Sequence, residues 1–245
     1  MPQAAAAGAE VPVPAAAPAP SSSCRPSAAP IPHNIDFRPA CAADTAAAAA
    51  MFAAAFEEDP EIQYIYKGVK QHQYKPAVQA LYSKCTRLFF CRKGCPSWCA
   101  IDAATQELIG AASITPLKAY PGLLTYATHG LLLGRQWPSL SCLRRMWQTS
   151  DASEAAEEHP HLGITAELSF LGVTPAYQGR GVGRQLLQAI LAAWDAQQGG
   201  PLILYTAQSK ALGLYQSQGF EVLEVQEIGG AQLTIWYMHR PQLQP

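Results

Sequence analysis

Apolar residues in the last third of the chain follow strand and helix periods in alternation. Ile164–Val173 is a mostly apolar run of strand length that carries one acid, Glu167. The helix predicted over Gly183–Gln197 has a single apolar face, made of Leu186, Leu187, Ile190, Leu191 and Trp194. Glycines and a proline then separate three further strands and one helix, which we expect at Leu202–Tyr205, Phe220–Val225, Leu233–Met238 and Lys210–Ser217.

The segment from Ile35 to Thr115 shows the same alternation of strand and helix periods. Ile35–Arg38 alternates like a short strand, and Ala42–Phe56 is predicted to be helical because alanine is the best helix former. Asp59-Pro60 closes that helical segment. Helical spacing and then two alternating runs predict a second helix and a hairpin over Gln73–Phe89, Ser97–Asp102 and Glu107–Thr115.

Two segments follow neither period. Residues 1–33 are rich in alanine, proline and serine, and they hold too little apolar bulk to fold, so we expect a disordered tail. The alternative is an organelle transit peptide, which usually carries more arginines. Residues 116–161 are predicted to form an irregular insertion or binding lid, with helical pieces at Leu131–Leu133 and Ser139–Trp147 and a solvated acidic stretch at Asp151–Glu158. The domain is expected to span residues 34–240.

Composition and charge exclude several classes of protein. Hydrophobic residues make up 49% of the 245 residues and charged residues 14%, which allows a large buried core. The formal net charge of −1 gives no basic footprint for nucleic acid, and no apolar run approaches the roughly 20 residues that span a bilayer. We therefore expect a soluble protein without nucleic-acid or membrane partners.

Cysteine usage bears on compartment and metal. The seven cysteines are an odd set, and no secretory signal precedes them, which favours free thiols in the cytoplasm. A plastid or another organelle is the alternative if residues 1–33 are a transit peptide. Three residues separate Cys91 from Cys95, and three more separate Cys95 from Cys99. Zinc sites usually have paired cysteines at a different spacing, so no metal is expected. Buried or idle thiols are the ordinary interpretation.

The loop between the strand at Ile164–Val173 and the following helix carries the clearest chemistry. Its sequence is Tyr177-Gln-Gly-Arg-Gly-Val-Gly-Arg184. Three glycines allow backbone amides to approach a ligand closely, and a helix N-terminus favours anions. Arg180 and Arg184 add positive charge, so the loop is suited to a pyrophosphate. A tight turn alone would also need glycines, and the loop has neither the Lys-Ser/Thr of a Walker A motif nor the usual setting of a dinucleotide motif.

Neighbouring residues extend this signal to a family. Gln178-x-x-Gly181-x-Gly183 follows a strand, and Leu214-Tyr215-x-x-x-Gly219-Phe220 comes about thirty residues later. Together these segments resemble the two motifs of the GNAT N-acetyltransferases, and the opening strand and helix, Asp36–Pro39 and Ala55–Pro60, are also similar. The resemblance covers about residues 34–240, weakly over 116–161. It implies an α/β domain of the α+β type, with a mixed, mostly antiparallel sheet of six or seven strands flanked by helices.

The resemblance also implies a cofactor site. Acetyl-CoA would be the co-substrate, with its pyrophosphate on the backbone of Gln178, Gly179, Arg180, Gly181, Val182 and Gly183. Main-chain groups of Leu171 and Val173 would pair with the pantetheine arm, in a slot opened where the strand diverges from its neighbour at a bulge. Gln208 stands where many members carry an asparagine that touches the cofactor, and its longer side chain puts that role in question.

Two residues are candidates for acid–base catalysis. Tyr215 matches the family's general acid, and Glu167 occupies the position of the catalytic glutamate in the family's histone acetyltransferases. An ordinary phenol pKa near 10 suits proton transfer to a thiolate, and burial of Glu167 would raise its pKa towards neutrality. The alternatives are that Tyr215 is packing at a helix end, and that Glu167 faces a wet cleft or pairs with an arginine.

The predicted activity is direct transfer of an acetyl group from acetyl-CoA to a primary amine. An acetyl-cysteine route is disfavoured because no cysteine lies in the two motif segments. A non-catalytic CoA sensor or scaffold, and a transferase for another acyl-CoA, are the alternatives. The acceptor stays open between a small molecule and a protein lysine or N-terminus, although His159 and His161 lie close to the candidate base in sequence. Oligomeric state is not predicted.

Overall fold

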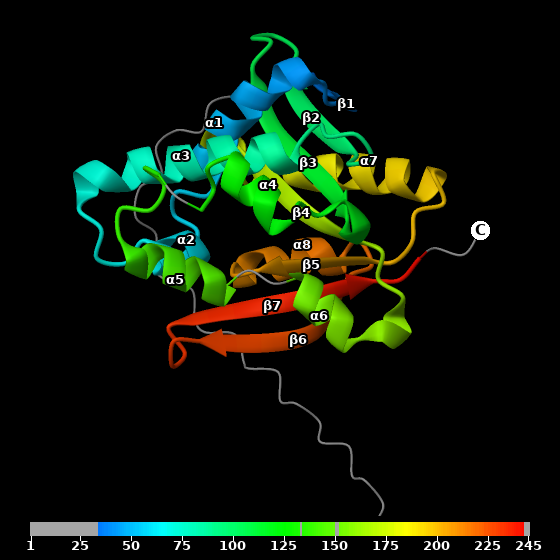
Figure 1. Cartoon of the computed structure of the whole chain (residues 1–245). Coiled ribbons are helices and arrows are strands. Elements are labelled where there is room, and N and C mark those ends of the chain that lie inside the picture. Colours follow the sequence, from blue (N-terminus) through cyan, green and yellow to red (C-terminus); the bar gives the residue numbers. More distant parts are fainter. Residues whose placement is uncertain (1–33, 133, 150–151, 243–245) are drawn as a thin grey trace, which may run out of the picture. The chain divides into compact units, whose positions relative to one another are not determined.

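The computed structural model describes residues 34–132, 134–149 and 152–242. They form a seven-stranded sheet with the order β1-β2-β3-β4-β5-β7-β6, drawn in Figure 1. Neighbouring strands run antiparallel, except for the parallel pair β4 and β5 at the centre. The predicted class, a mixed and mostly antiparallel sheet flanked by helices, is confirmed. The strands are β1 (Ile35–Pro39), β2 (Ser97–Asp102), β3 (Leu108–Pro116), β4 (Ala166–Val173), β5 (Leu202–Thr206), β6 (Glu221–Ile228) and β7 (Leu233–Arg240).

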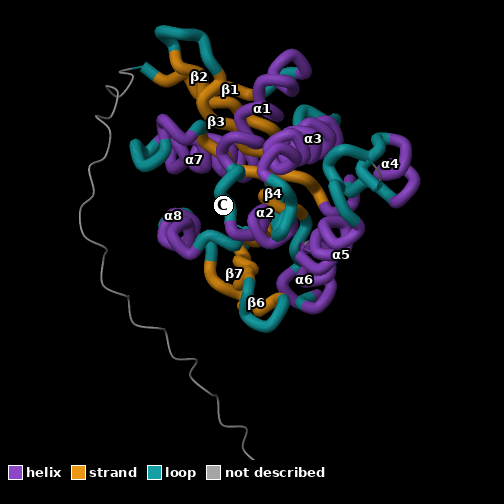
Figure 2. The backbone as a smooth tube through the Cα atoms, turned by 90° about the vertical axis from the view of Figure 1, so that its left-hand side faces the viewer, coloured by secondary structure: helices purple, strands orange, loops and turns teal. Residues whose placement is uncertain are grey.

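Helices lie on both sides of the sheet. Figure 2 shows α7 (Val182–Ala196) and α8 (Leu212–Gln216) on one side, and α1 (Thr45–Ala55) and α3 (Gln71–Phe89) on the other. The short α2 (Pro60–Ile65) follows α1. The remaining helices are α4 (Leu123–Thr128), α5 (Leu140–Thr149) and α6 (Ala152–Glu158).

The apolar face predicted for α7 packs against the centre of the sheet. Its leucines and isoleucine are buried against Ala112, Leu168, Leu202 and Met238. Each fully buried aliphatic side chain contributes about 1.5–3 kcal/mol, so this contact fixes α7 and the loop before it. On the opposite side, Phe52 of α1 is completely buried within a cluster that α3 completes.

A glycine in β4 permits the close approach of α1. A Cβ built on Gly172 would lie 2.8 Å from Cδ1 of Phe52, closer than such contacts occur. Any larger residue would therefore push the Phe52 ring away from the strand. This contact sets α1 tightly on the strand that carries the candidate base.

The segment 116–161 is more regular than the sequence indicated. The helix expected at Ser139–Trp147 is present as α5, but Leu131 and Leu132 are not helical, and α4 comes earlier instead. Leu133, Ser150 and Asp151 lie outside the described residues. The acidic stretch forms α6, in which Ala155 and Ala156 are buried and Glu157 and Glu158 are exposed. These helices are stabilised by contacts with the rest of the domain, so the local sequence pattern was too weak to predict them.

Helix α2 was missed by sequence analysis. Asp59-Pro60 was interpreted as the end of a helical segment, whereas Asp59 is the N-cap of a new helix with Pro60 in its first turn. Proline is common in that position because the missing N–H would have no partner there. Among the described helices none is long and apolar enough to cross a membrane. Residues 1–33, predicted as a tail, lie outside the described part of the chain.

Candidate active site

The central feature of the sheet is the divergence of β4 from β5. The two strands pair only at Ala166–Leu202 and Glu167–Ile203, although both continue further. On its other edge β4 pairs with β3 along its length, but the register shifts so that Ser169 has no direct partner. A bulge of this kind bends a strand. The predicted bulge and divergence are confirmed, and they leave one edge of β4 unpaired from β5 beyond Glu167.

Alternation of hydrogen bonds shows which β4 residues face the open side. The Thr174 amide donates to the carbonyl of Ile109 at 2.8 Å, so Val173 directs its own N–H and C=O away from β3. Leu171 is two residues back without an intervening bulge, and it points the same way. The Val173 carbonyl accepts a hydrogen bond from Nε2 of Gln178 at 2.9 Å. The amides of Leu171 and Val173 therefore face the gap as donors.

The glycine loop begins at the end of β4 and leads directly into α7. Gly179 and Gly181 have φ values of +73° and +83°, a left-handed conformation that favours glycine. Gly181 is the N-cap of α7, so the first amides of the helix have no intrahelical acceptor. They form a site for an anion, strengthened by the helix dipole. Gly179 and Gly181 are exposed, as an incoming ligand requires.

Side chains hold this loop in place. The Tyr177 hydroxyl donates to Oδ2 of Asp102 at 2.9 Å, which ties the loop to the end of β2. The guanidinium of Arg180 lies 5.8 Å from the centre of the Tyr177 ring. Val182 is buried beside Ile109 and Val173, so it anchors the start of the helix. Arg184 is exposed. The two arginines thus add positive charge beside the anion site, and the contacts of Tyr177 and Val182 fix the backbone of the loop.

Glu167 is the last β4 residue paired with β5, at the point where the gap opens. Its side chain is 4% exposed, and no described side chain donates a hydrogen bond to its carboxylate or forms an ion pair with it. Burial raises the pKa of Glu167 to about 8. Glu167 is thus buried, and no arginine pairs with it among the described residues. A carboxylate with this pKa can accept a proton from an amine near neutral pH.

Two acids that sequence analysis did not single out lie at the same gap. Oδ1 of Asp59 accepts from the amide of Glu61 at 2.9 Å, and Oδ2 accepts from Nε2 of Gln208 at 2.6 Å. The second bond joins the start of α2 to the end of β5. Burial, and then the charges of Asp59 and Glu167, raise the pKa of Glu61 to about 8 against a hydrogen bond from Thr149. The Asp-Pro-Glu capping pattern was the signal that could have located α2 and hence these acids.

Tyr215 lies on the α7 side of the sheet. It packs against the cluster that includes Leu168 and Leu186, with its ring edge-to-face on Phe220 at 6.0 Å. Burial and the charge of Asp59 both raise the pKa of Tyr215 above its usual value, so the phenol stays protonated at neutral pH. The packing role and the acid role are compatible in this position. Gln208 was expected near the cofactor, but its side-chain amide donates a hydrogen bond to Asp59.

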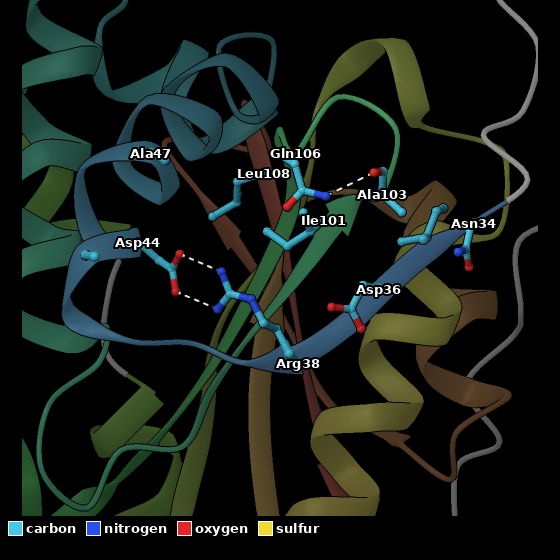
Figure 3. Close-up of a pocket in the computed structure, with 11 residues that line it drawn as sticks. Asn34, Asp36, Arg38, Asp44, Ala47, Ile101, Ala103, Gln106 and Leu108 are labelled. Carbon is cyan, nitrogen blue, oxygen red and sulfur yellow. Dashed lines mark hydrogen bonds and ion pairs between the residues drawn. The ribbon is translucent and has the colours of Figure 1, made fainter.

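Other features carry less chemistry. A cavity of about 470 Å³, shown in Figure 3, is lined by residues of β1, β2 and the start of β3, with Arg38 forming two hydrogen bonds to Asp44 at 2.8 and 2.9 Å. It lies at the β1 edge of the sheet, away from the β4–β5 gap. No group of three metal-binding side chains occurs within the described residues, and the cysteines described there are free thiols.

Comparisons with known proteins agree with this geometry. Residues 148–222 match the model of the acetyltransferase (GNAT) domain, from the end of α5 into β6. A stretch of 57 residues is 47% identical to the N-alpha-acetyltransferase RimI of Mycobacterium tuberculosis; it covers 22% of this chain and 34% of the relative. The chain thus spans about a third of that relative's length.

Solved structures show the same fold. A mosquito arylalkylamine N-acetyltransferase like 5b matches with a TM-score of 0.55 and 16% identity, over 85% of this chain and 100% of its own. A Corynebacterium glutamicum structure described as histone acetyltransferase HPA2 and related acetyltransferase matches with a TM-score of 0.56 and 18% identity, over 86% and 98%. Such low identities support the fold alone. The family match identifies the part of the chain with β4, the glycine loop and α7 as a GNAT acetyltransferase domain, and the solved structures share the fold around it.

Proposed function

We propose that the protein transfers an acetyl group from acetyl-CoA to a primary amine, by direct attack with both substrates bound. The observation that carries this proposal is the divergence of β4 from β5. Four features next to this divergence support the proposal: an anion site on the glycine loop, unpaired strand amides, a buried carboxylate and a protonated phenol. Each is a component that amine acetylation by a thioester needs.

The residues present fit acetyl-CoA. The amides between Gln178 and Gly183 suit a pyrophosphate, because the left-handed glycines expose them at the start of α7. An extended amide-containing arm can hydrogen-bond to the open edge of β4 at Leu171 and Val173 as an added strand would. Bound in this way, acetyl-CoA supplies an activated thioester at the inner end of the gap. A strand amide near Leu171–Val173 would donate to the thioester carbonyl as negative charge develops on its oxygen.

Glu167 and Tyr215 divide the proton transfers between them. An acceptor amine arrives mostly protonated, and Glu167 removes a proton, directly or through one water, to give the nucleophilic form. Tyr215 donates its hydroxyl proton to the departing sulfur of CoA, and the second proton, which the nitrogen loses as the amide forms, restores the phenol through solvent. Burial supports both roles, since it makes Glu167 more basic and keeps Tyr215 protonated. The two residues lie on opposite sides of the sheet, one towards the α2 side and one towards α7.

The names of the matched proteins refer to different acceptors. The matched bacterial protein is named an N-alpha-acetyltransferase and the mosquito protein an arylalkylamine N-acetyltransferase, so both names refer to amines as acceptors. A primary amine is the shared chemistry, and we propose it for this chain.

Binding of the co-substrate is tested by thermal unfolding with acetyl-CoA at about 100 times its Kd. The expected stabilisation is about 2.7 kcal/mol, or roughly 5–10 °C for a domain of this size. The double variant Gly181→Glu/Gly183→Glu should lose this shift. Gly94→Glu is the matched control: Gly94 has the same left-handed backbone, with φ +81°, and open space around it. It should retain the shift despite similar strain.

Release of CoA thiol in the presence of amines completes the test. A thermal shift with no thiol release from any acyl-CoA and amine would indicate a CoA-binding sensor or scaffold instead of an enzyme. Release with propionyl-CoA but not acetyl-CoA would change the donor and leave the amine chemistry. No shift in folded wild-type protein would overturn the proposal as a whole.

A further inference from the structure

Three carboxylates gather at the β4–β5 gap without a cation paired to any of them. They belong to Asp59, Glu61 and Glu167, and the charges of Asp59 and Glu167 both act on Glu61. The ion pairs in the described part of the chain lie elsewhere, as Arg38–Asp44, Lys75–Glu57 and Arg240–Asp195. The charge of Lys210 favours the ionised form of Asp59, but the two form no ion pair. The protein therefore gathers carboxyl groups that have no cationic partner where we propose that the acceptor amine arrives.

The three acids differ in how they can meet a ligand. Asp59 is 7% exposed, and both of its oxygens already accept hydrogen bonds from the protein. Glu167 is more than nine-tenths buried and has no partner among the described side chains, so its carboxylate is available inside the gap. Glu61 is partly exposed in the first turn of α2. Glu61 is thus the more exposed of the two glutamates, and Glu167 is the more deeply buried.

Electrostatics makes a cation the natural ligand of this arrangement. Like charges in a low-dielectric site repel strongly: burial and the charges of Asp59 and Glu167 raise the pKa of Glu61, whereas burial alone raises the pKa of Glu167. A cation between them would favour the ionised form of both. One positive charge is consumed in the reaction, because Glu167 takes a proton from the attacking amine. Glu61, which has a hydrogen bond from Thr149, then still lacks a cationic partner.

We infer that the acceptor is a small amine with a second positive charge, which the Glu61 carboxylate binds while Glu167 deprotonates the reacting nitrogen. The inference rests on the proposed function and names its substrate class, an aliphatic diamine. Asp59 is a positioning residue in this scheme: it caps α2 and, through Gln208, holds that helix beside β5. A charge-assisted hydrogen bond in such a site is worth about tenfold to a hundredfold in binding.

The test compares acceptors of one length that differ only in the distal group. The panel is 1,4-diaminobutane, 4-aminobutan-1-ol and n-butylamine, with a short peptide bearing a free N-terminus, each assayed for thiol release from acetyl-CoA. We expect kcat/KM for the diamine to exceed that for the amino alcohol by about tenfold or more. Equal values for the two would overturn the inference.

Two variants assign the preference to Glu61. Glu61→Gln should lower kcat/KM for the diamine by much more than for the amino alcohol, and so bring their ratio close to one. Glu58→Gln is the matched control, because Glu58 is an exposed acid three residues earlier in the chain, and it should keep the wild-type ratio. A ratio that persists in Glu61→Gln would overturn the role of Glu61.

The panel also separates the inference from the proposed function. Turnover of the peptide N-terminus or of n-butylamine without turnover of the diamine would overturn the diamine class and leave the acetyltransferase intact. No thiol release with any amine would overturn the proposed function, and the inference would fall with it.

Discussion

The two sides of the β4–β5 gap are built in different ways. The proposed cofactor side is a continuous stretch of chain, from Leu171 through the glycine loop to the first turn of α7, and it offers mainly backbone amides. The acceptor side is assembled from separate segments that contribute Asp59 and Glu61, Thr149, Glu167 and Gln208, and it works through side chains. A backbone site tolerates side-chain changes that keep its φ values, whereas a side-chain site depends on each residue and on the fold that joins them.

The largest effect should come from Glu167 on the acceptor side. Glu167→Gln removes the base and should lower kcat/KM by about 10²–10⁴-fold. Its raised pKa also sets a pH dependence: the base works only when ionised, so wild-type activity should rise with pH up to about 8 and then level off. A pH–rate profile checks this.

The control for Glu167→Gln is the cofactor side, where the thermal shift with acetyl-CoA should be unchanged. An unmoved profile with full turnover would show that Glu167 is not the base. If the step near pH 8 persists at reduced rate, Glu61, which has a similar pKa, would take its place.

A smaller loss, about 10²-fold in kcat, is expected for Tyr215→Phe, at the lower end of the range for general acids. The phenylalanine keeps the ring contact with Phe220, so Tm should change little. Acyl donors whose thiol has a lower pKa need less help from an acid, and they should lose less activity in the variant. Steady-state rates with both kinds of donor measure this, and equal rates in Tyr215→Phe and wild type would leave Tyr215 as packing alone.

A variant of Gln208 tests whether this residue belongs to the acceptor side or to the cofactor side. Gln208→Leu leaves Oδ2 of Asp59 without its donor in a buried position, which should cost about 1–3 kcal/mol of unfolding free energy. That corresponds to a fall in Tm of roughly 2–12 °C. If Gln208 serves the acceptor side alone, the Kd for acetyl-CoA should stay the same. A weaker affinity for acetyl-CoA in Gln208→Leu would return Gln208 to the cofactor contacts that the family resemblance implies.

Local patterns in the sequence were sufficient for most of the central fold. The apolar faces of α7 and α3 and the alternation in β2 and β3 have strong periods, and their positions agree with the structure within a few residues. Such elements bury a regular stripe, which the residue spacing records directly. Helices α2, α4 and α6 are six or seven residues long, or about two turns, and too short for a period to emerge. Their stability depends on caps and on contacts with distant residues.

By itself the sequence determined the strand, the glycine loop and the helix that follow one another from Ala166 to Ala196, because backbone conformation there depends on nearby residues. It also located Glu167 and Tyr215 as candidates. Only the tertiary structure decided which acids surround Glu167, that Gln208 bonds to Asp59, and that β4 and β5 part after two paired residues. These features join residues as much as 149 positions apart, and burial and charge at such contacts exist only once the chain has folded.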